Sequence, residues 1–266
     1  MKYSLLIFIF LISLIGCTEQ KKGPSVVTKE VSYSSDTVTL KGFLAYDENQ
    51  KDVRPGVLVV HEWWGHNQYA RKRAIMLAEL GYAALAVDMY GDGKQADHPE
   101  DAGKFAMAVM QSMPTAKARF QAAVNFLKEQ TQTDKSRIAA IGYCFGGGVV
   151  LRMAVAGEDL KGVVSFHGSL PTDSVENPKQ VKAKFLVCNG EDDGFVPAEQ
   201  IDAFKKAMID AGINFKFVNY PGAVHSFTNP DADSLAKKFN MPIAYNKQAD
   251  EESWKDMKLF LEDVFK

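Results

Sequence analysis

The sequence predicts an α/β protein with a mostly parallel central sheet, helices on both faces of that sheet and an N-terminal β hairpin. Short, almost wholly apolar runs such as Gly56–His61 are typical of strands buried on both faces. These runs alternate with segments of helical periodicity, as in β-α-β units. The composition, with 46% apolar and 24% charged residues, is that of a globular protein and excludes a disordered or fibrous chain.

The elements follow in order along the chain. Val26–Ser34 and Thr37–Tyr46 are rich in β-forming residues, and Ser35-Asp36 between them predicts a hairpin turn. Further strands are expected at Gly56–His61, Tyr82–Val87, Arg137–Gly142, Gly162–Phe166, Phe185–Asn189 and Phe215–Tyr220. Helices are expected at Tyr69–Leu80, Asp101–Met113, Thr115–Glu129, Gly147–Ala156, Ala198–Ala211 and Asn246–Phe265, with Pro114 dividing the second from the third. In such sheets, active residues gather at the carboxyl ends of the strands.

The first residues carry the signal of an exported protein. Lys2 is followed by the apolar run Leu5–Ile15, which is too short to span a bilayer and is typical of a signal peptide. Leu14-Ile15-Gly16-Cys17 resembles a bacterial lipobox, whose cysteine is lipidated and becomes the first residue of the mature chain; a plain signal peptide with an incidental cysteine is the alternative. We expect a signal peptide at 1–16, a polar tether at 17–25 and one domain at 26–266. The acyl chains on Cys17 would then hold the exported protein on a membrane surface.

Charge and cysteine content exclude other classes of protein. Lys and Arg together number 31 against 33 Asp and Glu, so the basic excess typical of a nucleic-acid binder is missing. Three cysteines cannot build a disulfide scaffold of this size. The two histidines of His61–His66 do not have zincin spacing, so we expect no metal, and nothing in the sequence indicates an organic cofactor.

The segment Gly142–Gly146 reads G-Y-C-F-G between a predicted strand and a predicted helix. It has the form of a nucleophile elbow, G-x-S-x-G, with Cys144 in place of serine. The glycines are needed because side chains at Gly142 and Gly146 would collide in so tight a turn. The helix N-terminus would also stabilise a thiolate at Cys144. A buried cysteine beside a glycine-rich helix start is the alternative interpretation.

Two further strand ends carry an acid and a base. The segment Gly190–Pro197 follows one strand and contains both Asp192 and Asp193, and His225 follows the next strand. Nucleophile, acid, base is the chain order of α/β-hydrolase triads, in which a histidine takes the proton and a carboxylate orients it. The order alone leaves Asp192 and Asp193 as competing candidates for the acid. His167, after a further strand, is a candidate neighbour of the site without an identifiable partner.

Together these motifs resemble the dienelactone hydrolase family. The shared features are the H-E-W-W-G turn at His61–Gly65, the G-Y-C-x-G-G elbow, the D-x-x-V-P element at Asp193–Pro197 and the H-S-F segment at His225–Phe227. The likeness spans about Val38 to Phe265. It implies an α/β-hydrolase fold with a Cys144–His225–Asp193 triad, and it favours Asp193 because that residue is followed by x-x-V-P.

The resemblance also implies roles for the residues around the triad. The family's turn glutamate corresponds to Glu62, which would contact the resting thiol and be displaced by substrate as the thiolate forms. The backbone N–H groups of Trp63 and Phe145 would form the oxyanion hole. The candidate residues of the substrate pocket are Trp64, Tyr90, Lys94 and Phe227.

The substrate-binding arginines of the family are missing. Dienelactone-cleaving members place one arginine shortly after the D-L-Y strand end and another four residues past the histidine, where both hold a substrate carboxylate. The segments Asp88–Asp92 and His225–Asn229 contain no arginine. Asp92 and Asn229 cannot replace a fork of two N–H donors, and Lys94 would supply only a point charge. The sequence thus predicts the chemistry but not a dienelactone as the substrate.

The predicted function is hydrolysis of a small carboxylic ester or lactone by a monomeric enzyme without a cofactor. Cys144 attacks the carbonyl, an acyl-thioester forms and water releases it. A peptidase or acyl transferase on the same fold is one alternative, and a non-catalytic surface binding lipoprotein is another. A thiol-redox role would lack a resolving partner, because Cys188 lies in an apolar strand and Cys17 is expected to be acylated.

Overall fold

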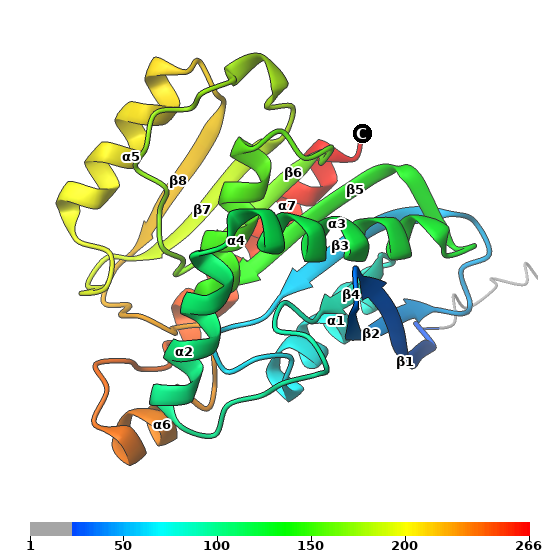
Figure 1. Cartoon of the computed structure of the whole chain (residues 1–266), viewed down its shortest axis with the longest axis horizontal. Helices are drawn as coiled ribbons and strands as arrows, with labels where there is room; N and C mark the ends of the chain where they lie inside the picture. The colour runs from blue at the N-terminus through cyan, green and yellow to red at the C-terminus, as the bar shows by residue number, and fades with distance from the viewer. Residues whose placement is uncertain (1–22) are drawn as a thin grey trace, which may run out of the picture.

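The computed structural model describes residues 23–266, so the predicted signal peptide and Cys17 lie outside the described residues. Eight strands in this range form one sheet in the order β1-β2-β4-β3-β5-β6-β7-β8 (Figure 1). The hairpin of β1 (Val26–Ser35) and β2 (Val38–Asp47) is antiparallel, and β2 pairs antiparallel with β4 (Ala83–Val87). Every other pair in the sheet is parallel. This topology confirms the predicted hairpin and the mostly parallel sheet.

The central strands are apolar because both of their faces are covered. Their bounds are Arg54–Val60 for β3, Thr133–Tyr143 for β5, Gly162–Phe166 for β6, Lys184–Gly190 for β7 and Phe215–Tyr220 for β8. All five residues of β4 and of β6 are buried. β5 begins at Thr133, four residues earlier than predicted. Its polar residues Thr133 and Asp134 pair with Arg54 and Pro55 at the start of β3, and the register of the pair shifts between Pro55 and Gly56.

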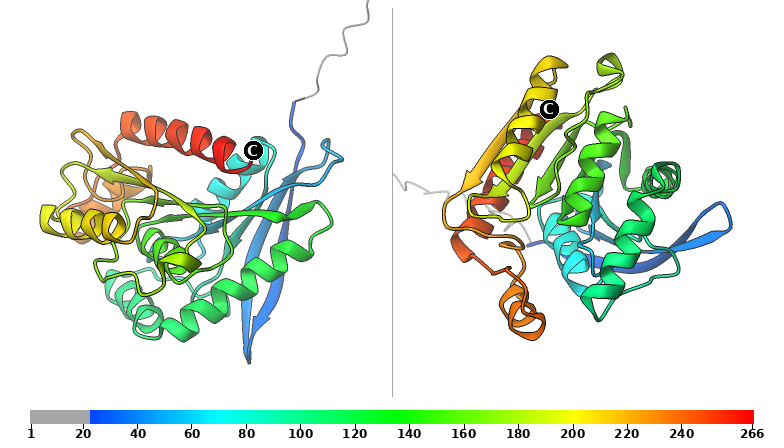
Figure 2. Two further views of the ribbon diagram at one scale, coloured as in Figure 1. Left: turned by 90° about the horizontal axis from the view of Figure 1, so that it is seen from above. Right: turned by 60° about the vertical axis from the view of Figure 1, so that its left-hand side comes forward.

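Helices cover both faces of the sheet, as predicted (Figure 2). On one face lie α1 (Gln68–Glu79) and α7 (Lys247–Val264), whose buried residues form one apolar cluster with the strands. The other cluster includes residues of α2 (Pro99–Met110), α3 (Met113–Glu129), α4 (Phe145–Val155) and α5 (Ala198–Asp210). Among residues 23–266, no helix combines the length and the apolar character that a membrane crossing requires.

Two helical segments differ from the prediction. Pro114 lies in the first turn of α3 instead of between two helices. The N–H groups of a helix's first turn have no carbonyl partner within the helix, so a proline, which has no N–H, is tolerated there. Helix α6 (Ala232–Phe239) was not predicted. Its Leu235 and Phe239 pack with Trp64 and with residues of α2, so the segment between β8 and α7 folds back beside the turn that follows β3.

The parallel strands β3, β5, β6, β7 and β8 are neighbours and run in one direction, so their carboxyl ends share one edge of the sheet. The chain leaves that edge at His61, Cys144, Gly190 and the turn before His225. This topology brings together segments that are far apart in the sequence.

Candidate active site

Cys144 occupies a strained turn between β5 and α4. Its φ of 52° and ψ of −115° lie outside the regions that residues with side chains ordinarily adopt. A Cβ on Gly142 would lie 2.1 Å from the Gly146 carbonyl oxygen, and a Cβ on Gly146 would lie 2.3 Å from the carbonyl oxygen of Val60. The two glycines are therefore sterically required. The Gly146 N–H also donates to the His61 carbonyl at 3.1 Å, which ties the elbow to the end of β3.

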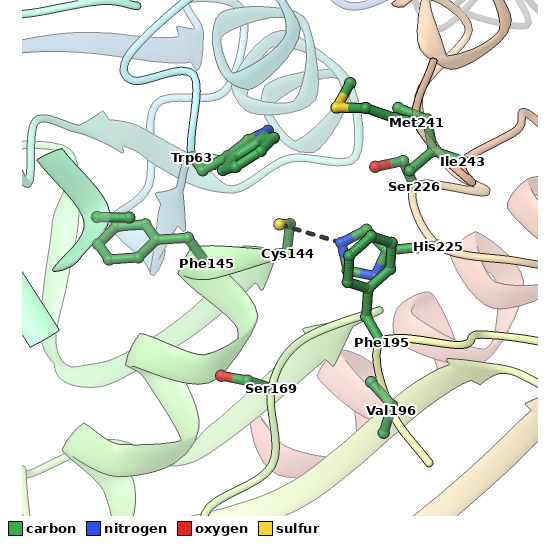
Figure 3. A pocket seen from close by; sticks show the side chains of 11 residues that line it. Trp63, Cys144, Phe145, Ser169, Phe195, Val196, His225, Ser226, Met241 and Ile243 are labelled. Carbon is green, nitrogen blue, oxygen red and sulfur yellow. Dashed lines mark hydrogen bonds between the residues drawn. The ribbon is translucent and has the colours of Figure 1, made fainter. Parts of the chain in front are cut away.

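His225 lies between the thiol and a carboxylate. Its Nε2 is 3.1 Å from Cys144 Sγ, and its Nδ1 is 2.9 Å from Asp193 Oδ2. Figure 3 shows the thiol and the imidazole side by side in the cavity wall, joined by this hydrogen bond. Asp193 is buried and also accepts the Phe195 N–H at 2.9 Å, whereas Asp192 is exposed. The structure thus places the three predicted side chains, from three separate strand ends, in one line of contacts.

The charge state of His225 depends on these two neighbours. Burial lowers the pKa of the imidazole, but the Cys144 sulfur and the Asp193 carboxylate raise it more strongly, and the net pKa is about 10. The ring is therefore protonated at neutral pH. A protonated imidazole beside a cysteine is the environment that favours a thiolate over a thiol.

Glu62 is fully enclosed beside the triad. Its carboxylate accepts hydrogen bonds from Asn229 Nδ2 at 2.6 Å and from Ser226 Oγ at 3.3 Å, and burial raises its pKa. In this arrangement the thiol contacts His225, and the carboxylate is held by these two donors instead of by Cys144. Asn229 stands four positions past His225, where dienelactone-cleaving members of the family that the sequence resembles carry an arginine, and it binds Glu62.

Trp63 and Phe145, whose backbone N–H groups are the predicted oxyanion-hole donors, both line the cavity at Cys144. Phe145 is the first residue of α4, and Trp63 is in the turn after β3. No hydrogen bond to either N–H is found within residues 23–266. The Trp63 turn is fixed by Tyr90, whose hydroxyl donates to the Trp63 carbonyl at 2.9 Å, and by a Gly65 N–H to Glu62 carbonyl bond at 3.2 Å.

A cavity of about 330 Å³ opens at the thiol (Figure 3). Its walls come from the β3 turn, the elbow, α2, the loops after β6, β7 and β8, and the segment that follows α6. The lining residues are Trp63, Ala106, Cys144, Phe145, Ser169, Phe195, Val196, His225, Ser226, Met241 and Ile243.

The four predicted pocket residues do not line this cavity. Trp64 is buried against Phe239, and Tyr90 is buried where its hydroxyl holds the Trp63 turn. Lys94 is half exposed, and its Nζ lies 3.9 Å from Asp92 Oδ2. Phe227 is fully buried and packs against the ring of His167.

Some of the lining residues could have been found from the sequence. Phe195, Val196 and Ser226 lie within the motifs that carry Asp193 and His225, so their positions were a usable signal. Met241 and Ile243 gave no such signal, because they reach the site through the fold of α6.

A buried polar network lies behind His225. The ring of His167 meets the His225 ring edge to face at 5.1 Å, and its Nε2 is 2.7 Å from Thr228 Oγ1. That hydroxyl is in turn 2.6 Å from the hydroxyl of Tyr69. Burial lowers the pKa of His167 well below its usual value, so this ring stays neutral beside the charged one.

Arg73 connects the network to α7. Its guanidinium donates to Tyr69 Oη at 3.3 Å, to the Thr228 carbonyl at 2.7 Å and to Asp250 at 2.6 Å. The sequence identified His167 but none of these partners. The chain separations are too large for any local pattern: Thr228 is 61 residues from His167 and 159 from Tyr69.

The sequence model described as "Dienelactone hydrolase family" matches residues 40–265. The chain belongs to the dienelactone hydrolase family. As a member it is a hydrolase that resembles carboxymethylenebutenolidases and acts on esters or lactones.

Individual proteins are similar to this chain over most of their length. The chain is 30% identical to "Protein usf" of Aquifex pyrophilus over 82% of this chain and 97% of the relative, and 30% identical to a putative carboxymethylenebutenolidase of Aquifex aeolicus over 77% and 89%. A crystal structure of a dienelactone hydrolase-like promiscuous phosphotriesterase from metagenomic libraries superposes with a TM-score of 0.85 at 33% identity. That superposition covers 91% of this chain and 99% of the other, and it confirms the α/β-hydrolase fold.

Proposed function

We propose that Cys144, His225 and Asp193 form a catalytic triad that hydrolyses its ester or lactone through an acyl-thioester. The observation that supports this most directly is the unbroken line of contacts, with 3.1 Å between sulfur and Nε2 and 2.9 Å between Nδ1 and the carboxylate. Both distances permit proton transfer or a hydrogen bond without rearrangement.

The first half of the reaction acylates the enzyme. The Cys144 thiolate attacks the carbonyl carbon, and the negative charge moves to the oxygen between the N–H groups of Trp63 and Phe145. The carbon–oxygen bond to the alcohol then breaks. The His225 imidazolium gives its proton to the departing alkoxide, which leaves a thioester and a neutral imidazole.

The second half returns the enzyme to its starting state. Neutral His225 takes a proton from water, and the resulting hydroxide attacks the thioester carbonyl. The carbon–sulfur bond breaks, the acid is released and the thiolate is again paired with an imidazolium. Asp193 holds the ring with Nδ1–H toward its carboxylate throughout, so that Nε2 faces the reacting atoms.

Glu62 is the proposed activating group. In the arrangement described here Asn229 and Ser226 hold its carboxylate, so contact with the thiol requires the side chain to rotate away from these two donors. Ser226 directly follows His225 and lines the cavity, so a bound substrate can disturb that pair of hydrogen bonds.

The test is hydrolysis of p-nitrophenyl acetate by the purified chain and by Cys144→Ala. We expect turnover to fall to the background rate in the variant while the circular dichroism spectrum is retained. Cys188→Ala is the matched control, since Cys188 is a buried thiol in β7 away from the cavity, and it should remain active. Turnover retained in Cys144→Ala would reject the triad.

We also propose that residues 1–16 are a lipoprotein signal peptide, that Cys17 is the acylated first residue of the mature chain, and that the domain is held on the outer side of a membrane. The lipobox-like Leu14–Cys17 supports this. Palmitate labelling and membrane fractionation test it in a bacterial host. Cys17→Ser should lose the label and release the domain, and a labelled Cys17→Ser protein would contradict the proposal.

A further inference from the structure

The cavity at Cys144 is apolar apart from the reacting groups. Eight of its eleven lining residues are apolar or aromatic side chains or the reactive thiol, and the other three are Ser169, His225 and Ser226. No lysine or arginine of residues 23–266 lines it. Ligand pockets of about 300 to 1,000 Å³ accommodate drug-sized molecules, so a cavity of about 330 Å³ suits a small substrate.

Acidic side chains contact the residues that line the cavity. Asp193 contacts the lining residue His225, and Glu62 contacts the lining residue Ser226. Among residues 23–266, the lining residue that can carry a positive charge is His225, and its ring already pairs with Asp193 Oδ2 at 2.9 Å. A carboxylate on the acyl chain would lose its water here and gain no unpaired cation in return.

Within residues 23–266, Arg152 is the arginine or lysine whose side chain hydrogen-bonds to a residue that lines the cavity, namely Ser169. Its Nη1 lies 3.5 Å from Ser169 Oγ and donates to the Gly148 carbonyl at 3.3 Å. It sits eight residues past Cys144 on α4, which is about 12 Å along the helix axis. Arg152 lines a separate cavity with Asp173 and Glu176 and is not among the residues that line the cavity at Cys144.

We propose that this site selects uncharged esters or lactones with a small apolar acyl group and rejects substrates whose acyl chain carries a carboxylate. This proposal rests on the proposed function, because it places the acyl group on Cys144. Phe195, which is 53% exposed and lies 4.8 Å from the His225 ring, and Met241 and Ile243 from the segment after α6 provide the apolar walls.

The first experiment compares three p-nitrophenyl esters of matched length on the purified chain: the valerate, the hemisuccinate and the methyl ester of the hemisuccinate. We expect kcat/KM for the hemisuccinate to be at least about 100-fold below that of the valerate, because its charge is desolvated without a partner. The neutral methyl ester should recover most of the loss. From acetate to butyrate, each added methylene should raise kcat/KM by about fourfold.

The second experiment adds a cation inside or outside the cavity. Ala106 lines the cavity from α2, whereas its neighbour Met107 is 58% exposed and does not line it. Ala106→Lys should raise the hemisuccinate-to-valerate ratio of kcat/KM by about tenfold or more, since the lysine supplies the missing partner. Met107→Lys adds the same charge on the same helix and should leave the ratio unchanged.

The outcomes separate this proposal from the one on which it rests. Equal hydrolysis of the valerate and the hemisuccinate by a Cys144-dependent enzyme would overturn the charge selection alone. If Arg152→Met then abolished the hemisuccinate activity, that guanidinium would be the carboxylate partner. Hydrolysis of none of the esters would overturn the proposed function and this proposal together.

Discussion

The two sides of the His225 ring differ in chemistry. Toward Cys144 the ring faces an apolar cavity whose lining includes few polar side chains. Behind it lies His167, followed by the hydroxyls of Thr228 and Tyr69 and the guanidinium of Arg73. Both sides are formed by residues that come together only in the folded chain.

We infer from this difference that the cavity side selects the substrate, whereas the network side positions the base, His225. The cavity side is built from turns and from the segment after α6, where a side chain can change without disturbing the core. The network side joins α1, the loop after β6 and α7 through buried hydrogen bonds, each of which leaves an unpaired group if it is broken. Changes on the first side should alter specificity, and changes on the second should alter kcat and stability.

The largest effect on activity is expected at Asp193, whose carboxylate orients the His225 ring between the cavity and the network. Asp193→Asn should lower kcat by about 10³- to 10⁴-fold, because the amide can hold the wrong tautomer of His225. The exposed Asp192→Asn is the matched control and should retain activity. Steady-state kinetics on p-nitrophenyl acetate would measure both, and a large loss in Asp192→Asn instead would assign the acid to the other aspartate.

The same variant should change the pH profile. The Asp193 carboxylate contributes to the raised pKa of His225, about 10, so its removal lowers the pH at which the imidazolium is lost. With an alkyl ester, whose leaving group needs that proton, the alkaline limb of kcat/KM should move to lower pH in Asp193→Asn. An unmoved limb would show that His225 does not supply the proton.

Arg73 should have the largest effect on stability. Its side chain and that of Asp250 are 4% and 15% exposed, so Arg73→Met leaves a largely buried carboxylate without its partner, at a cost of about 3 to 5 kcal/mol. Arg71→Met is the control on the same helix, because Arg71 pairs with the exposed Glu30 and should cost about 1 kcal/mol or less. Urea unfolding of both variants measures the difference, and equal costs would contradict a structural role for the network.

The sequence predicted the parts of the site that depend on local geometry. The elbow at Cys144, the acid turn at Asp193 and the histidine at the end of β8 each follow a strand within a few residues, so motif and element order located them. The network and the cavity wall depend on tertiary contacts. Asn229 meets Glu62 across 167 residues of chain, and α6 is placed by the packing of Leu235 and Phe239 on Trp64.

A change at Thr228 should have a smaller effect on stability than the change at Arg73, and it also tests the network side. Thr228→Val keeps the shape of the side chain but leaves His167 Nε2 and the Tyr69 hydroxyl without their shared partner, at a cost of about 1 to 3 kcal/mol. We expect kcat to fall by about tenfold with KM little changed, because Thr228 does not line the cavity. Thr228→Ser should restore both values, and a change confined to KM would place Thr228 on the substrate side.

Glu62 should give the smallest effect, visible in the pH dependence of stability. Burial raises the pKa of Glu62 above its usual value of 4.5, so the folded state holds this proton more tightly than the unfolded state. The stabilisation that comes from this tighter proton binding is therefore complete below about pH 4.5 and is lost as the pH rises through the pKa that Glu62 has in the folded state. In urea unfolding, the stability of Glu62→Gln relative to wild type should increase with pH over that range, with exposed Glu191→Gln as control. Parallel curves would contradict the burial of an ionisable Glu62.

The most direct test of the proposed chemistry is to find the acyl group on the enzyme. The chain is mixed with p-nitrophenyl acetate, quenched with acid within the first turnover and analysed by peptide mass spectrometry. We expect an acetyl group on the peptide that carries Cys144, with its amount matching the burst of p-nitrophenol, and none in Cys144→Ala. Full turnover without acylation of Cys144, or acetylation of a different side chain at the same rate, would contradict a cysteine nucleophile.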